Sequence, residues 1–284
     1  MRTILIFCYA LCTAITYTAA GQNVDALPYK STVYFTKQQL QQDMLFMHRK
    51  MEEVHPNLYH SITKEAYIKL RDSLANTLPD SLTASDAWPK LARLVAAINE
   101  GHTMLQGIKD EMKFLKESGY PLFPVNFKAF DGKHLIVRED AYAESVLQTG
   151  DKVTAINGLP ASTLMALFTA AYGGLQNWKE LNALQDFIVA MYRHQLTAPY
   201  RIQYLSGNSV KEIVYKGMPY PLYTERLKAI RKTTQAKQVV PYTFERLEGN
   251  VGYLNLRTFG TDYNRFDSFL QATFNDLKTN GTKG

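Results

Sequence analysis

Residues 150–158, GDKVTAING, decide the fold expected for the middle of this chain. Gly150 and Gly158 stand at its two ends, where glycine permits tight turns. Val153 and Ile156 lie between them and supply apolar side chains to a core. The stretch therefore predicts a short strand between two turns, a pattern that any β-hairpin with glycine turns shares.

The flanking segments predict further strands and helices on both sides. Residues 122–130 alternate like a strand, and Asp131-Gly132 is a strong hairpin signal before a return strand at 135–137. On the other side we expect a short helix over 160–170, a longer helix over 175–196, and a hairpin of residues 200–204 and 210–215.

The first hundred residues predict a helical module. Thr36-Lys37-Gln38-Gln39 is a capping box, and His55-Pro56 ends the helix that it opens. A second helix is expected over 63–78, and a third runs from Thr83 to Gly101, a suitable C-cap residue. His102 then lies at the exit of the module.

The last sixty residues predict a connector followed by an incomplete domain. Residues 222–238 are polar and basic and indicate a connector, and strands follow at 242–246 and 251–256. A strand followed by a helix begins a β-α crossover, and the next parallel strand is not in the sequence. We therefore expect the domain to be cut at Gly284. The last helix has an apolar face made of Phe266, Phe269, Leu270, Phe274 and Leu277.

The composition is that of an ordinary globular protein. The 284 residues are 46% hydrophobic and 20% charged, with a formal net charge of +6. The densest basic cluster indicates a solvated helix face, so we expect no nucleic-acid partner. This cluster consists of Arg226, Lys228, Arg231, Lys232 and Lys237.

The N-terminus predicts export. Arg2, an uncharged apolar run over 4–17, and the small residues Thr18-Ala19-Ala20 are typical of a signal peptide, which is too short to be a comfortable membrane anchor. We expect a periplasmic or extracellular protein with no stable membrane span after cleavage. Cys8 and Cys12 both lie in this segment, so the mature chain would have no disulfide, thiol nucleophile or cysteine-based zinc site.

His102 is the candidate for chemistry. A histidine exchanges a proton near neutral pH, and its place at a helix end would position it by backbone. Glu100 could orient His102 through a carboxylate contact, although an exposed glutamate at the helix end is the simpler interpretation. The alternative for His102 is a turn histidine that caps the preceding helix. The other histidines are scattered without ligand spacing, so we expect no metal and no cofactor.

Together these motifs carry a resemblance to a known family. Residues 150–158 match the Gly-Asp-x-Ile-x-x-Ile-Asn-Gly pattern of PDZ domains in bacterial proteases. With NEGHT at 99–103 upstream, the chain resembles the tail-specific, or C-terminal processing, serine proteases, and within them the tricorn-core-like branch. EVHPNLY at 53–59, YTF at 242–244 and VGYL at 251–254 also fit, so the resemblance spans residues 36–284.

The resemblance implies an α+β architecture of several parts. These are a signal peptide (1–21), an N-terminal helical module (22–115), a PDZ-like β-rich domain (116–220), a linker (221–240) and the start of a crotonase-like protease core (241–284), here incomplete.

The resemblance also implies an active site. A histidine at the position of His102 is the general base for a serine on a glycine-rich turn, which would lie beyond Gly284 together with an assisting glutamate. Gly101 stands where some members of the tricorn-core-like branch have a serine. In the other branch of the family, a serine-lysine pair carries out catalysis and a histidine at this position is not required. The loop and strand that would hold a peptide contain Tyr120, Leu122, Phe123 and Val125.

The function that we expect is an exported serine-type endopeptidase acting on peptides or unfolded protein tails, with this portion inactive alone. The alternative is a non-catalytic PDZ-like protein that binds extended peptides. A weaker third hypothesis is the binding of small apolar ligands, as relatives in animals bind retinoids. Neither the substrate nor the oligomeric state follows from the sequence.

Overall fold

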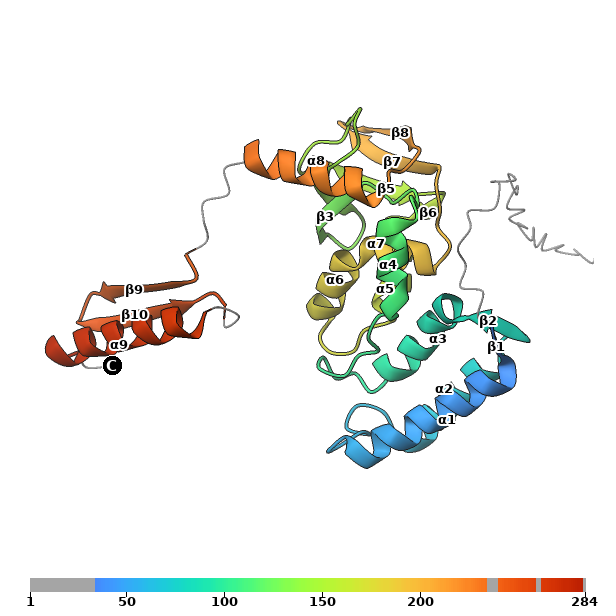
Figure 1. Ribbon diagram of the computed structural model, residues 1–284, viewed down its shortest axis with the longest axis horizontal. Helices are drawn as coiled ribbons and strands as arrows, with labels where there is room; N and C mark the ends of the chain where they lie inside the picture. The colour runs from blue at the N-terminus through green and yellow to red at the C-terminus, as the bar shows by residue number, and fades with distance from the viewer. Residues whose placement is uncertain (1–33, 234–239, 259–261, 283–284) are drawn as a thin grey trace, which may run out of the picture. The chain divides into compact units, whose positions relative to one another are not determined.

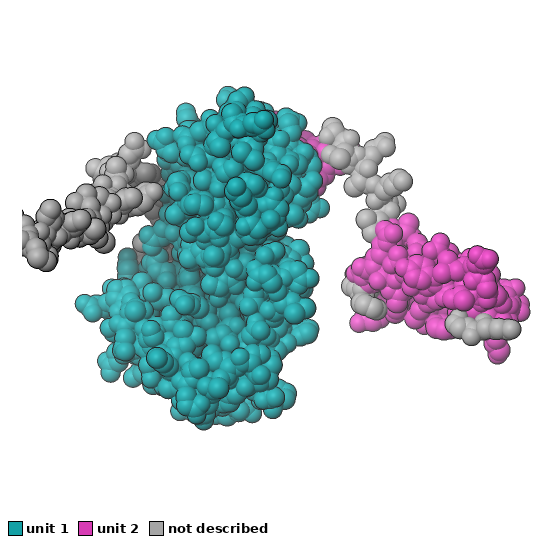
Figure 2. Space-filling model, turned by 180° about the vertical axis from the view of Figure 1, so that it is seen from behind, with its two compact units in different colours: residues 1–223 teal, residues 224–284 magenta. Residues whose placement is uncertain are grey.

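The computed structural model describes residues 34–233, 240–258 and 262–282, so the predicted signal peptide lies outside the described residues. The fold is mixed α+β, as the sequence predicts. The chain divides into two compact units, residues 1–223 and 224–284, shown in teal and magenta in Figure 2. Each unit is described separately below.

The helical lobe of the first unit comprises residues 34–108 (Figure 1). It holds β1 (Tyr34–Thr36), α1 (Lys37–Val54), α2 (Lys64–Asn76), β2 (Ser81–Thr83) and α3 (Ala84–Ala96), and β1 pairs antiparallel with β2. The predicted capping box at Thr36 is present, with the side chains of Thr36 and Gln39 each bonding the other's backbone N–H. Helix α1 ends before an extended His55, as the following proline predicts.

The end of α3 differs from the prediction. The helix stops at Ala96, and Asn99, with a φ of 55°, takes the left-handed position expected of Gly101. The side-chain Oδ1 of Asn99 accepts a hydrogen bond of 3.1 Å from the backbone N–H of Gly174. Asparagine tolerates the left-handed conformation, and here its side chain also gains a hydrogen bond. Gly101 therefore does not cap the helix, and it packs against Trp178 instead.

The sheet lobe of the same unit comprises residues 109–223. It begins with α4 (Lys109–Glu117), which the sequence analysis did not predict, and continues with β3 (Val125–Phe130), β4 (Leu135–Asp140), β5 (Lys152–Ile156) and β6 (Leu159–Pro160). Helices α5 (Ala161–Thr169), α6 (Gln176–Gln185) and α7 (Phe187–Arg193) precede β7 (Tyr200–Ser206) and β8 (Ser209–Tyr215).

The sheet confirms the strand expected in residues 150–158. All its pairings are antiparallel in the order β3-β4-β5-β7-β8, and β6 pairs with β5 across a turn in which Asn157 and Gly158 both have positive φ. Val153 and Ile156 are fully buried in the main core.

The single helix expected over 175–196 is two helices, α6 and α7. They meet at Asp186, whose φ of −92° and ψ of 12° interrupt the helix. The Asp186 carboxylate accepts a hydrogen bond of 2.7 Å from the hydroxyl of Tyr172. The break turns Phe187 into the core, where its ring lies 4.9 Å from that of Phe127.

The segment expected as a connector is largely helical. Helix α8 (Tyr220–Thr233) starts in the first unit, where the Tyr223 hydroxyl donates to Asn126 Oδ1 over 2.7 Å. Arg226, Lys228, Arg231 and Lys232 are exposed on it, while Lys237 lies outside the described residues.

Beyond α8, the described residues of the second unit form a hairpin and a further helix. Strands β9 (Tyr242–Leu247) and β10 (Val251–Leu256) pair antiparallel, and α9 (Tyr263–Thr279) packs on them. The Tyr242 ring lies 5.0 Å from Phe266 and 5.3 Å from Phe269. Phe274 is 59% exposed, so the predicted apolar face of α9 is only partly covered.

A buried charge joins the two lobes of the first unit. The Arg193 guanidinium, at the end of α7, donates to both carboxylate oxygens of Glu111 in α4 at 2.6–3.1 Å. It also lies 3.6 Å above the ring of Trp88 in α3, whose indole N–H donates to the Gln106 carbonyl over 2.9 Å. Three helices therefore meet at one side chain.

Glu111→Ala should lower the free energy of unfolding by about 3–5 kcal/mol, because it leaves the Arg193 charge buried without its partner. Urea titration followed by circular dichroism measures the loss. Glu117→Ala, at an exposed glutamate of the same helix, is the control and should change stability by less than about 0.5 kcal/mol. Equal effects of the two variants would contradict the role of the buried pair.

Candidate functional site

The turn that follows α3 fixes the backbone on both sides of His102. Asn99 N–H bonds the Ala96 carbonyl over 3.0 Å, and Thr103 N–H bonds the Glu100 carbonyl over 3.4 Å. The histidine is therefore carried by a hydrogen-bonded turn directly joined to a helix.

The Glu100 carboxylate makes three hydrogen bonds within the turn, two with His102 and one with Thr103. His102 Nδ1 lies 2.9 Å from Glu100 Oε1, and the His102 backbone N–H and the Thr103 hydroxyl each donate to Oε2 over 2.9 Å. These bonds, first those from His102, lower the pKa of Glu100 to about 2, so it is ionised at neutral pH. The contact by which Glu100 could orient His102, which the sequence offered beside an exposed glutamate, is therefore present in the structure.

The geometry defines the tautomer of His102. An ionised carboxylate only accepts, so His102 Nδ1 donates its proton to Glu100 and Nε2 is the nitrogen left to exchange a proton. The His102 side chain is 98% exposed, so Nε2 is open to solvent. An imidazole with an accessible Nε2 and a carboxylate on Nδ1 is the arrangement of a general base.

Two glycines and a tryptophan clamp this turn from the sheet lobe. A side chain at Gly173 would come within 2.7 Å of the Glu100 carbonyl oxygen, and Gly174, with a φ of 91°, lies against Gly101. The Trp178 ring covers Gly101 on its other side, where an added Cβ would meet it at 3.3 Å. The turn is therefore positioned by both lobes.

The four residues expected to contact a peptide are all buried: Tyr120, Leu122, Phe123 and Val125. The backbone of Leu122 is already paired, donating to and accepting from Met218 over 2.9 and 3.0 Å. The Tyr200 hydroxyl bonds the carbonyl of Pro121 over 2.8 Å. These side chains do not lie near a free surface, and their peptide-binding role stays a prediction.

A buried histidine network in the helical lobe was missed by the sequence analysis. Arg71 donates to His48 Nδ1 over 2.9 Å, so the proton of neutral His48 is on Nε2, which lies 2.8 Å from the Tyr59 hydroxyl. Tyr59 in turn donates to Glu52 over 2.6 Å. Burial lowers the pKa of His48, which keeps it neutral. Tyr59 and Arg71 are 11 and 23 positions from His48, so no local motif shows that they meet at its ring.

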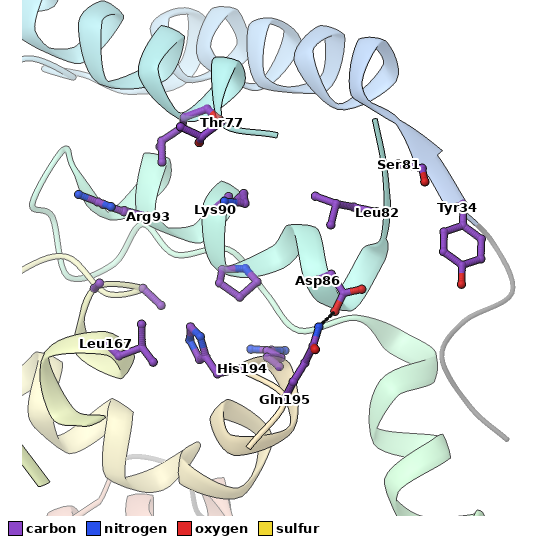
Figure 3. Close-up of a pocket in the computed structure, with 15 residues that line it drawn as sticks. Tyr34, Thr77, Ser81, Leu82, Asp86, Lys90, Arg93, Leu167, His194 and Gln195 are labelled. Carbon is purple, nitrogen blue, oxygen red and sulfur yellow. Dashed lines mark hydrogen bonds between the residues drawn. The ribbon is translucent and has the colours of Figure 1, made fainter. Parts of the chain in front are cut away.

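A groove of about 700 Å³ lies between the two lobes of the first unit. One wall is α3 with Asp86, Lys90 and Arg93, and Leu167, His194 and Gln195 lie opposite (Figure 3). Gln195 Nε2 donates to Asp86 Oδ1 across the groove over 2.8 Å. Neither the groove nor this bond was expected from the sequence.

Within residues 34–233, 240–258 and 262–282 no cluster of three metal-ligating side chains occurs. None of the helices in the same ranges is both long and apolar enough to cross a membrane.

No protein-family model and no curated protein matches the chain. Solved structures similar to it are of CPAF, a chlamydial serine protease. Mature CPAF matches with a TM-score of 0.47 at 13% identity, over 83% of this chain and 52% of that chain. A serine-to-alanine mutant of CPAF matches with a TM-score of 0.47 at 12% identity, over 83% of this chain and 53% of that chain. Mature CPAF in complex with lactacystin matches with a TM-score of 0.44 at 13% identity, over 63% of this chain and 34% of that chain. The chain thus spans about half of their length or less, and this similarity assigns no residue a role.

Gly173→Ala should lower the free energy of unfolding by about 1–3 kcal/mol, because the new methyl group would meet backbone atoms of Glu100 that cannot move aside. Gly101→Ala is the control and should cost less, since its methyl group meets only the Trp178 side chain. Chemical denaturation of both variants tests this order. A Gly173→Ala loss no greater than that of Gly101→Ala would contradict the clamp.

His194 should make stability depend on pH. Burial, and next the Arg193 charge, lower its pKa from 6.5 to about 4. As pH falls from 6.5 to 4 the unfolded chain takes up a proton that the folded chain refuses, so stability decreases, by about 1–3 kcal/mol for a partly exposed ring. His194→Phe keeps the ring stacked on Phe168 and should lose less stability than wild type between these pH values. Identical pH profiles in urea titrations would contradict this assignment.

Proposed function

We propose that this chain contributes the general base of a serine-type peptidase, and that His102 is that base. The observation that carries the proposal is the Glu100–His102 pair, in which Nδ1 is bonded over 2.9 Å to an ionised carboxylate and Nε2 is exposed. The clamp of Gly173, Gly174 and Trp178 supports it, because a base is effective when its position is fixed before the substrate arrives.

The proposed chemistry is general-base activation of a serine. Nε2 of His102 removes the proton of a serine hydroxyl as that oxygen attacks the peptide carbonyl, and later returns it to the leaving amine. Glu100 stabilises the imidazolium that forms between these steps. We place the serine outside the described residues, as the family resemblance implies.

The finer parts of the proposal concern family and substrate. We propose a tail-specific protease of the tricorn-core-like branch, exported, with a PDZ-like sheet lobe and a second unit that begins a crotonase-like core. The turn-strand-turn at residues 150–158 and the β9-β10-α9 order support this proposal. Peptides or unfolded protein tails are the proposed substrates. We also propose Tyr120, Leu122, Phe123 and Val125 as peptide contacts; their side chains are buried and the Leu122 backbone is paired with Met218, so this part of the structure would have to open for them to bind.

His102→Ala in the full protein should lower kcat for peptide hydrolysis by about a thousandfold or more, and Glu100→Gln by about a hundredfold. The measurement is hydrolysis of a quenched fluorescent peptide. His134→Ala is a matched control, because His134 Nδ1 also lies against a carboxylate, that of Asp131 at 3.1 Å, but in the β3–β4 hairpin.

Three outcomes separate the hypotheses. Loss of hydrolysis only in the His102 and Glu100 variants supports the proposed base. Unchanged turnover in His102→Ala contradicts it and favours a serine-lysine mechanism. Peptide binding without hydrolysis in any form of the protein, wild type included, favours the non-catalytic peptide-binding alternative.

A further inference from the structure

The groove between the lobes continues into a second hollow. The first hollow, of about 700 Å³, and the second, of about 290 Å³, share Arg93 and Ala170 among their lining residues. The second is lined further on by Ala96 at the end of α3, by Ala97 after it, and by Gln176 and Lys179 of α6. We call the two hollows together the interlobe trough. It follows α3 from Asp86 to its C-terminal end, directly before the turn that carries His102.

The charges along the interlobe trough are predominantly positive. Lys90 and Arg93 are one helical turn apart on α3, and Lys179 lies beyond them on α6. In the part of the chain that the structure describes, none of these three side chains has an ion-pair partner. Lys90 and Lys179 are half-buried, so their charges are only partly screened by water.

One carboxylate, that of Asp86, lines the trough beside these cations. Its Oδ2 accepts a hydrogen bond from the Thr83 hydroxyl over 2.9 Å and its Oδ1 from Gln195 over 2.8 Å, and because both donors are neutral they do not cancel its charge. The Arg193 charge is neutralised by Glu111. Lys90, Arg93 and Lys179 therefore outnumber the single carboxylate among the lining residues.

We propose that the interlobe trough binds an acidic segment of an extended polypeptide. Alternate side chains of an extended chain are spaced by about 6.6 Å, close to the 5–6 Å between neighbours one turn apart on a helix. Carboxylates at every second position can therefore meet Lys90 and Arg93 in turn. Leu167 lies on the wall opposite α3, toward which the side chains between the carboxylates point, and this apolar side chain suits a peptide better than a phosphodiester backbone.

The inference rests on the proposed function only in taking a polypeptide as the ligand. It adds a substrate preference: a segment with acidic residues at alternate positions would be held along α3, on the approach to the His102 turn. Binding by the trough does not require catalysis, so the two proposals can fail separately.

The test is fluorescence polarisation with a labelled ten-residue peptide in which glutamate alternates with valine. Lys90→Glu/Arg93→Glu in the full chain should weaken binding at least tenfold, and Lys90→Gln/Arg93→Gln should weaken it less. Lys211→Glu/Lys216→Glu, on exposed positions at and after β8, changes the net charge equally and should change the dissociation constant less than twofold. His102→Ala should bind like wild type, even where it abolishes hydrolysis.

Several results would overturn the inference. These are absence of binding to the wild-type chain, equal weakening in the trough and control variants, or equal affinity for a peptide in which lysine replaces glutamate. Palmitate or a single-stranded oligonucleotide that binds in place of the acidic peptide would also overturn it, and would point to a different anion. Circular dichroism and the milder glutamine variant exclude misfolding as the cause of a loss.

Discussion

The buried guanidinium of Arg193 is the interaction on which the arrangement of the first unit depends. Its charge is compensated by Glu111 and covered by Trp88, so α3, α4 and α7 must meet at one point for it to be buried at all. Apolar packing alone tolerates small shifts between helices, whereas a bidentate ion pair specifies one geometry. The ion pair fixes α7 against α4, and the contact of the guanidinium with the Trp88 ring is what ties α3 to this point.

Helix α3 then connects two features that are separate in the sequence. Its side forms a wall of the interlobe trough, and its end leads into the turn where Glu100 orients His102. Gly173 and Gly174 hold that turn from the sheet lobe, so both lobes support His102 and both line the trough. A shift of one lobe would change the trough and the position of the imidazole together.

The sequence predicts those parts of the structure that local chemistry determines. The capping box at Thr36, the end of α1 before Pro56, and the strand in residues 150–158 each depend on neighbouring residues, and each is confirmed. The break at Asp186 and the left-handed Asn99 depend on hydrogen bonds to Tyr172 and Gly174, which are distant in the chain. For the same reason the trough was missed. The contact between Glu100 and His102 is local, but an exposed glutamate can adopt several conformations, so the sequence alone does not select this one.

The two tryptophans have a consequence for spectroscopy. The chain contains only Trp88 and Trp178, and they report on different places. Trp88 is buried under a guanidinium at the junction of three helices, whereas Trp178 is 41% exposed and lies on Gly101, beside the histidine turn. Their emission should therefore differ in wavelength and in accessibility to a soluble quencher. The protein thus carries one intrinsic fluorophore for the lobe junction and another for the turn that holds His102, without any label.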